Sequence, residues 1–232
     1  MTDKIPDINS PDRLRVFVSN SYLDRSMAMK IRNRLGEYGI NVYIAHNERD
    51  VSPILVEKIL ENISTTTVFI PLLTRNFFSS EWTMQECGAA VALAKLIVSV
   101  SVEAEPVGYL GKFTSIKPLR DPDGSINTES LCNELLKFLY TKGIITNDHV
   151  IKGFTNAMTF TEANYAAEFL KEVDETDSIS IEEATRLFTG SMDNLILKGS
   201  FKASKILTEI LEKYKESLSR ETIEQLSQKK IL

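Results

Sequence analysis

Apolar runs with the length of β-strands alternate with helical patterns over the first 140 residues of the chain. The strand-like runs are residues 14–18, 40–44, 66–73 and 96–102, with a short extended piece at 115–119. Strands and helices of these lengths that alternate along a chain form a parallel sheet through right-handed crossovers. The pattern therefore predicts an α/β domain at 13–142. Its ligand site is expected beyond the carboxyl ends of the strands.

Strand patterns disappear after Gly143, and only helical ones follow, so we expect an all-helical domain at 143–232. Residues 1–12 are interpreted as a loose leader, and the acidic stretch 168–183 as a solvated loop. The last helical pattern, 200–228, carries a long apolar stripe that has two explanations, packing within the domain or a dimerisation helix. The expected helices are 147–158, 160–171, 180–198 and 200–228.

Composition excludes several classes of function. The net charge is −5 and no block of Lys and Arg occurs, which argues against nucleic-acid binding. No apolar run reaches about 18 residues, so no membrane span is expected. The polar N-terminal segment and the two cysteines, interpreted as reduced core residues, favour a cytoplasmic protein. The two histidines are far apart in the chain and no metal-ligand spacing is present, so we expect no metal.

A helix that begins near Ser80 carries an acid in an unexpected place. Trp82, Ala89, Ala90 and Leu93 form one apolar stripe at helical spacing, and Glu86 falls on that stripe. A carboxylate on the core side of a helix is costly to bury unless it is paired or used.

The alternative explanation for Glu86 is a structural one. Thr83 would be the true N-cap, and Glu86 would close a capping box three positions later. The residues of this helix leave both explanations open.

Common catalytic and nucleotide-binding motifs are missing from the sequence. Neither a glycine-rich dinucleotide motif nor a Walker loop is present, and neither His46 nor His149 has a nucleophile-elbow serine near it in sequence. A phosphoacceptor receiver domain shares the alternation of strands and helices. It needs an aspartate after the third strand, where Thr74 stands, so this function is rejected.

Several segments, in the correct order and spacing, resemble a Toll/interleukin-1 receptor (TIR) domain of the prokaryotic kind. The resemblance covers roughly residues 13–140 and stops before the helical tail. The segments are Val16–Ser21 with Asp24, Gly39–His46, Phe69–Thr74 with Asn76 and Phe77, Ser80–Glu86, and Ile97–Pro106.

The resemblance implies a flavodoxin-like sheet of five parallel strands. It also implies one of two functions. Some TIR domains are non-catalytic scaffolds or signalling modules that bind other TIR domains, and others release nicotinamide from NAD, leaving ADP-ribose or a cyclic ADP-ribose. In the enzymes a glutamate four residues after the Trp is essential, and Glu86 stands at that position after Trp82.

The same resemblance implies roles for the residues around Glu86. Ser19, Asn20 and Asp24 are expected to bind ribose or phosphate, His46 the nucleotide, and Trp82 is expected to form an apolar wall. Asp24 can equally be a helix cap, His46 a hydrogen-bonding loop residue, and Trp82 part of the core. NAD is expected as substrate and no metal is implied.

The resemblance also bears on assembly. Self-association through the TIR domain and the tail is expected, together with a part in anti-phage defence. Residues 51–53, Val-Ser-Pro, replace a commoner glycine-containing turn in the loop through which these domains associate.

Overall fold

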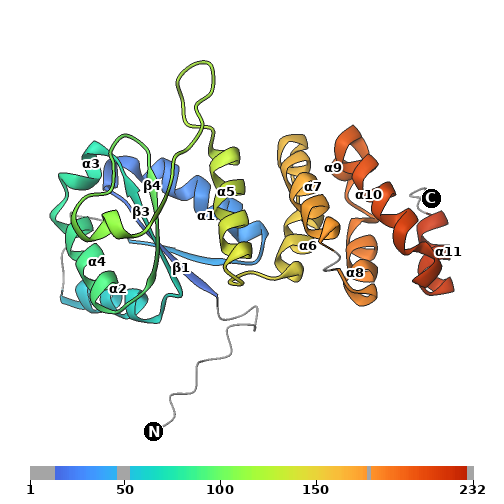
Figure 1. The fold of residues 1–232 in the computed structure, drawn as a ribbon, viewed down its shortest axis with the longest axis horizontal. Helices are drawn as coiled ribbons and strands as arrows, with labels where there is room; N and C mark the ends of the chain where they lie inside the picture. Colours follow the sequence, from blue (N-terminus) through green and yellow to red (C-terminus); the bar gives the residue numbers. More distant parts are fainter. Residues whose placement is uncertain (1–13, 46–52, 177–178, 229–232) are drawn as a thin grey trace, which may run out of the picture. The chain divides into compact units, whose positions relative to one another are not determined.

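The computed structural model describes residues 14–45, 53–176 and 179–228 of the chain (Figure 1). Within these residues the chain forms two compact units. The first contains the segment up to Gly36 and residues Ile40–Leu135, and the second contains Glu37–Gly39 and the chain from Leu136 onward. The division passes through one long helix, α5.

The first unit is built on a single five-stranded sheet in which every pair of neighbouring strands is parallel. The strand order is β2-β1-β3-β4-β5, which is the flavodoxin-like order expected from the resemblance. Every residue of the central strand β3 is buried, as predicted for a strand covered on both faces. The strands are β1 (Arg15–Ser19), β2 (Asn41–Ile44), β3 (Val68–Leu73), β4 (Leu96–Ser101) and β5 (Thr114–Ile116).

Helices cover both faces of this sheet (Figure 1). Side chains of α2, α3 and α4 join one core cluster with residues of β1, β3 and β4. Helices α1 and α5 share the opposite face, where Arg34 of α1 forms a 3.0 Å ion pair with Glu129 of α5. The helices are η1 (Tyr22–Asp24), α1 (Arg25–Glu37), α2 (Pro53–Thr65), α3 (Arg75–Phe78), α4 (Glu81–Ala92), η2 (Gly108–Lys112) and α5 (Thr128–Thr141).

The strand register arranges the face towards α2 and α4 in rows. One row is large and apolar, because Phe17 pairs with both Tyr43 and Phe69, and Phe69 pairs with Ile97. The next row, nearer the carboxyl ends of the strands, is small, with Ser19 paired to Pro71 and Ser99 paired to Ser115. The packed core therefore ends where small and polar side chains begin.

The second unit consists of helices in its described part. They are the second half of α5, then α6 (Asn147–Thr155), α7 (Phe160–Glu175), α8 (Ile181–Ser191), α9 (Leu195–Gly199), α10 (Phe201–Tyr214), η3 (Lys215–Ser217) and α11 (Arg220–Gln228). Two helices expected from the sequence are each divided in two, the first into α8 and α9 and the second into α10 and α11. None of the helices in the described residues combines the length and apolar character that a membrane span needs.

The interpretation of the acidic stretch 168–183 as a loop was wrong for residues 168–175 and 181–183, which lie in α7 and α8. Helix α7 continues through it to Glu175, because Phe169, Leu170 and Val173 keep the helical period and are buried. Its acids lie on the outer face of α7 and pair with lysines. The ion pairs are Glu168–Lys202, Glu172–Lys137 and Asp174–Lys213. Local composition suggested a loop, whereas burial of the opposite face decided for a helix.

The apolar stripe of the last helices packs within the unit. Ile206, Ile210 and Leu211 of α10 are buried, and so is Leu218 after η3. Of the two explanations left open by the sequence, packing within the domain is therefore the correct one for these side chains.

Candidate active site

The centre of the candidate site is a contact between the end of β1 and the second turn of α4. The hydroxyl of Ser19, the last residue of β1, donates a hydrogen bond of 2.5 Å to Oε2 of Glu86. Ser19 is fully buried, and Glu86 is only 4% exposed. The carboxylate thus lies at the carboxyl edge of the parallel sheet, where folds of this type bind their ligands.

Helix α4 turns Glu86 inward because of where the helix begins. Ser80 is its N-cap and accepts from the amide of Thr83 at 3.5 Å. Thr83 is therefore not the N-cap. It lies inside the helix, and its hydroxyl donates to the carbonyl of Phe77 at 2.5 Å. The capping-box explanation of Glu86 is thus contradicted by the start of the helix at Glu81.

The buried face of α4 differs from the predicted stripe. Thr83, Glu86, Cys87 and Ala90 are the buried residues, at the spacing i, i+3, i+4 and i+7, whereas Leu93 is exposed. The predicted stripe shares Glu86 and Ala90 with this face, but it included Trp82 and Leu93 where Thr83 and Cys87 are buried. These smaller side chains let the helix pack closely on the sheet. Glu86 therefore lies in the middle of the buried face.

Burial and the charge of Glu86 shift the acidities of neighbouring groups. The pKa of the Cys87 thiol is raised to about 12, mainly by burial and further by the negative charge of Glu86. The pKa of the Tyr43 hydroxyl is raised for the same two reasons, in the same order. Tyr43 lies on β2 beside Phe17, with ring centroids 5.2 Å apart. The charge of Glu86 is thus felt on two elements of this face.

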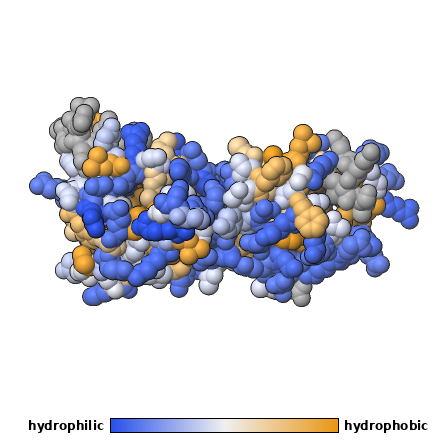
Figure 2. Space-filling view, turned by 90° about the horizontal axis from the view of Figure 1, so that it is seen from above, coloured by the Kyte–Doolittle hydropathy of each residue, from blue (hydrophilic) through white to orange (hydrophobic). Residues whose placement is uncertain are grey.

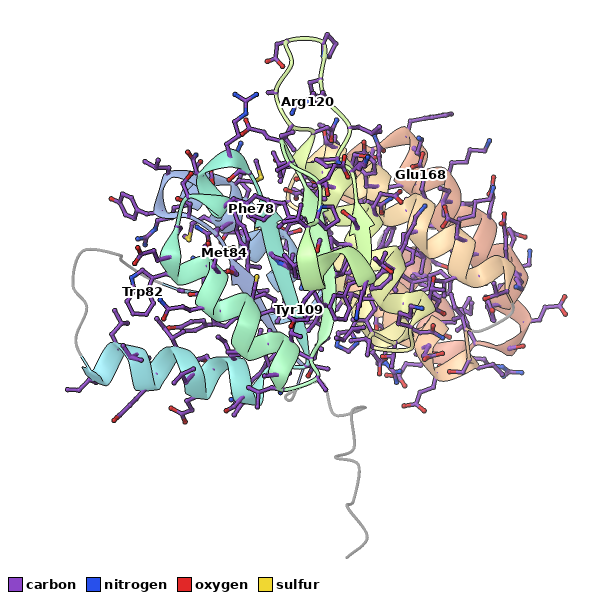
Figure 3. The ribbon with its side chains drawn as sticks, turned by 60° about the vertical axis from the view of Figure 1, so that its left-hand side comes forward. Phe78, Trp82, Met84, Tyr109, Arg120 and Glu168 are labelled. Atoms are coloured by element: carbon purple, nitrogen blue, oxygen red, sulfur yellow. The ribbon has the colours of Figure 1, made fainter. Side chains whose placement is uncertain are left out.

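Trp82 lies one turn before Glu86 but on the side of the helix. Figure 3 shows its indole pointing sideways from the start of α4, and the side chain is half-buried. This position leaves part of the ring exposed near the carboxyl edge of the sheet. Trp82 is therefore not in the centre of the core.

The loop after β1 brings a second polar group to the site. The side-chain amide of Asn20 donates to the carbonyl of Ser21 at 2.7 Å, and Ser21 caps the short helix η1. Asn20 is only 9% exposed, and its Oδ1 has no hydrogen-bond partner in the described part of the protein. A buried amide oxygen without a donor is unfavourable, so this atom is an unusual feature of the loop.

Asp24 has a structural explanation. Its two carboxylate oxygens accept from the Thr74 hydroxyl at 2.6 Å and the Asn76 amide at 3.1 Å. Thr74 in turn caps α3 by accepting from the amide of Phe77 at 2.9 Å. Asp24 thereby joins the loop after β1 to the loop after β3. The structure brings it to the same edge of the sheet as Ser19 and commits its oxygens to protein donors.

The remaining predicted ligand, His46, lies outside the described residues, as do residues 47–52 of the same loop. In the part of the chain that is described, no cluster of three or more His, Cys, Asp or Glu side chains is placed to hold a metal ion.

Ser99 is a further polar residue on this face that sequence reasoning missed. It lies on the central part of β4, is fully buried, and its hydroxyl has no hydrogen-bond partner among the described residues. The register places it in the same small row as Ser19. The signal was a single serine inside the apolar run 96–100, a place where valine or isoleucine is expected.

Comparison with known proteins supports the family suggested by these segments. Residues 16–132 match the TIR domain family, and this match covers half of the chain's 232 residues. A search of curated proteins found no match. The matched range contains both residues of the Ser19–Glu86 pair and all of the sheet except Arg15, and the strand order is the one expected for this fold. The chain therefore belongs to the TIR domain family.

Proposed function

We propose that this TIR-domain protein cleaves the N-glycosidic bond of NAD, releasing nicotinamide, with Glu86 as the catalytic carboxylate. The observation that carries the proposal is the hydrogen bond from Ser19 to Glu86 at the carboxyl edge of the sheet. It connects two elements 67 residues apart and holds an acid where a ligand is expected. TIR domains include enzymes of this kind, and Glu86 stands at the position of their essential glutamate.

One carboxylate suffices for this chemistry. The nicotinamide of NAD is already cationic and leaves as a neutral molecule, so no general acid is needed. The ribose that remains develops oxocarbenium character, and a carboxylate beside it stabilises the positive charge. Water or another part of the nucleotide then attacks the sugar, giving ADP-ribose or a cyclic ADP-ribose.

Ser19 acts in this proposal as a positioning residue. Its hydroxyl donates to Oε2 and so fixes the rotation of the Glu86 carboxylate towards the ribose. Oδ1 of Asn20, which has no hydrogen-bond partner among the described residues, accepts from a ribose hydroxyl or from the nicotinamide amide in this proposal. Trp82 forms the apolar wall at the side of α4.

The test is nicotinamide release by the full chain, measured by chromatography over a series of protein concentrations with and without a crowding agent. TIR domains commonly self-associate, and many TIR enzymes are active only when assembled, so the series is essential. We expect Glu86→Gln to lower release by about a hundredfold to a thousandfold, because it removes the charge and keeps the shape. Glu81→Gln, an exposed glutamate of the same helix, is the matched control.

A second candidate function is a non-catalytic scaffold or effector that binds other TIR domains. The observation in its favour is the burial of Glu86, which is 4% exposed. A protein that releases no nicotinamide even when concentrated and crowded, and that is unaffected by Glu86→Gln, would support the scaffold and contradict the enzyme.

We place the enzyme in the cytoplasm of a prokaryote, in anti-phage defence, because the resemblance is to TIR domains of that kind. Expression in bacteria challenged with phage tests this role. Loss of cellular NAD on infection, absent with Glu86→Gln, is the expected result.

A further inference from the structure

One end of the helical unit exposes more apolar surface than isolated side chains would. The side chains of Phe201, Leu195, Met158 and Phe160 are 86%, 77%, 72% and 54% exposed. Single exposed apolar residues are ordinary, but a contiguous group is not. Figure 2 shows apolar side chains at the surface of the helical unit, among hydrophilic ones.

Hydrogen bonds and packing bring these four residues together. The side-chain amide of Asn194, which caps α9 directly before Leu195, donates to the carbonyls of Thr155 at 2.9 Å and Ala157 at 3.0 Å, next to Met158. The ring of Phe160 lies against Gly199, where an added Cβ would stand 3.0 Å from the ring.

The chain then passes directly to Phe201, the first residue of α10. Phe160, Leu195 and Phe201 each occupy the first position of a helix, after the caps Thr159, Asn194 and Ser200. We call the four residues Met158, Phe160, Leu195 and Phe201 the apolar end patch.

The area and the charges of the apolar end patch indicate its occupant. A fully exposed large apolar side chain has an accessible area on the order of 200 Å². The exposed fractions of the four residues therefore add up to roughly 500–600 Å² of uncovered apolar surface. A stable interface takes about 800 Å² from each partner, with an apolar centre and a polar rim, so the patch supplies most of one such surface.

The rim of the apolar end patch carries charges of both signs. Glu162 and Asp193 follow and precede patch residues by two positions, and Lys198 and Lys202 lie close by in the same helices. A rim of one sign would repel its own copy. Acids and lysines balance each other on this rim, where Lys202 pairs with Glu168 of the same chain, so two copies can meet without net repulsion.

We propose that the apolar end patch is the dimer interface of this protein, and that its occupant is the same patch on a second copy of the chain. The interface is built by the helical unit and is independent of the TIR domain and of any activity at Glu86. Dimerisation through this patch tethers two TIR domains in one complex, and the tether raises the effective concentration of one domain around the other.

The first experiment is sedimentation velocity of the full chain over a wide concentration series. We expect a reversible dimer that is weakened at least tenfold by Phe201→Asp and by Leu195→Asp, because each change buries an unpaired charge at the centre of the interface. The matched control is Ile181→Asp. Ile181 is 52% exposed and also stands first in its helix, α8, but follows the other end of α7. Unchanged melting temperatures exclude unfolding as the cause.

A second experiment needs no destabilising charge. Phe201→Cys places a thiol in the patch, and a short bismaleimide reagent should crosslink it to the same residue of a second copy. The chain's own Cys87 and Cys132 are buried and do not compete. Ile181→Cys is the control and should not crosslink. A wild-type protein that stays monomeric at every concentration overturns the proposal, and so does a dimer that the patch variants leave intact.

Discussion

Two buried titratable side chains, one in each unit, show how differently a fold uses such groups. Glu86 in the TIR unit receives a hydrogen bond from Ser19, which is 67 residues away in sequence. His149 in the helical unit is bonded to Thr146, three residues away, whose amide donates to Nδ1 at 3.2 Å and closes a capping box. The Thr146–His149 contact gives His149 a structural role, because it provides an acceptor for a backbone amide at the start of α6. The Ser19–Glu86 contact, by contrast, satisfies no backbone group of α4. It holds a carboxylate at the edge of the sheet.

The comparison teaches which buried polar groups indicate function. A contact within one helix turn forms wherever that helix forms, so it carries no information about a site. A contact between distant elements forms only when the tertiary fold brings those elements together. At the carboxyl edge of a parallel sheet, such a contact to a buried acid indicates a ligand site. The predictions below test this distinction, beginning with the largest expected effect.

Replacing the acid itself should have the largest effect on activity and little on folding. Glu86→Gln is expected to lower nicotinamide release by about a hundredfold to a thousandfold, because the charge that stabilises the oxocarbenium ion is lost. Its melting temperature should not fall, since a neutral amide is easier to bury than a carboxylate. Release by chromatography and melting by circular dichroism measure the two quantities. A variant that keeps its activity would place Glu86 in the same class as His149.

Removing the distant partner of Glu86 should have an intermediate effect. Ser19→Ala is expected to lower kcat about tenfold to a hundredfold and to leave KM nearly unchanged, because the carboxylate loses its fixed orientation but the substrate contacts stay. Ser19→Thr keeps the hydroxyl and should recover part of kcat. A rise in KM with unchanged kcat would instead show that Ser19 binds substrate.

The capping box that His149 closes at the start of α6 should affect stability alone. His149→Ala is expected to lower the free energy of unfolding by about 1 kcal/mol, because the Thr146 amide loses its acceptor, with no effect on nicotinamide release per folded molecule. Urea denaturation followed by circular dichroism measures the loss. An effect on nicotinamide release would contradict the view that the Thr146–His149 contact is structural and only the Ser19–Glu86 contact is functional.

His149 also predicts a dependence of stability on pH. Burial lowers the pKa of its imidazole below the ordinary value, opposed by the charge of Asp148 and aided by Lys152. The unfolded chain therefore takes up a proton first as the pH falls, and the helical unit should lose stability below about pH 6.5. Protonation also puts a hydrogen on Nδ1, which then cannot accept from the Thr146 amide. Melting temperatures across this range should vary less for His149→Gln.

The smallest expected effect concerns the neighbour of Glu86. Because burial and the charge of Glu86 raise the pKa of Cys87 to about 12, its thiol should not react with iodoacetamide at neutral pH in the folded protein. Glu86→Gln removes only the smaller of the two causes, so this variant should stay unreactive as well. Rapid labelling of Cys87 in the native protein, detected by mass spectrometry, would show that this face of α4 opens to solvent.

The sequence by itself determined the fold class, because the period of apolar residues is a local property that decides between strand and helix. The run 66–73 could be assigned from its own residues, and the TIR-like segments could be placed in order. It also determined that Glu86 was an acid in an unusual position of its helix.

Only the tertiary structure decided which other residues Glu86 and its neighbours contact. Which face of α4 turns inward depends on how closely the helix packs, and it selected Thr83 and Cys87 where sequence reasoning chose Trp82 and Leu93. Whether the acidic residues of α7 lie in a loop or on a helix depended on the lysines and the core opposite them. Ser19 reaches Glu86 because strand register and helix position bring distant parts of the chain together, and no local pattern in a sequence records such a distance.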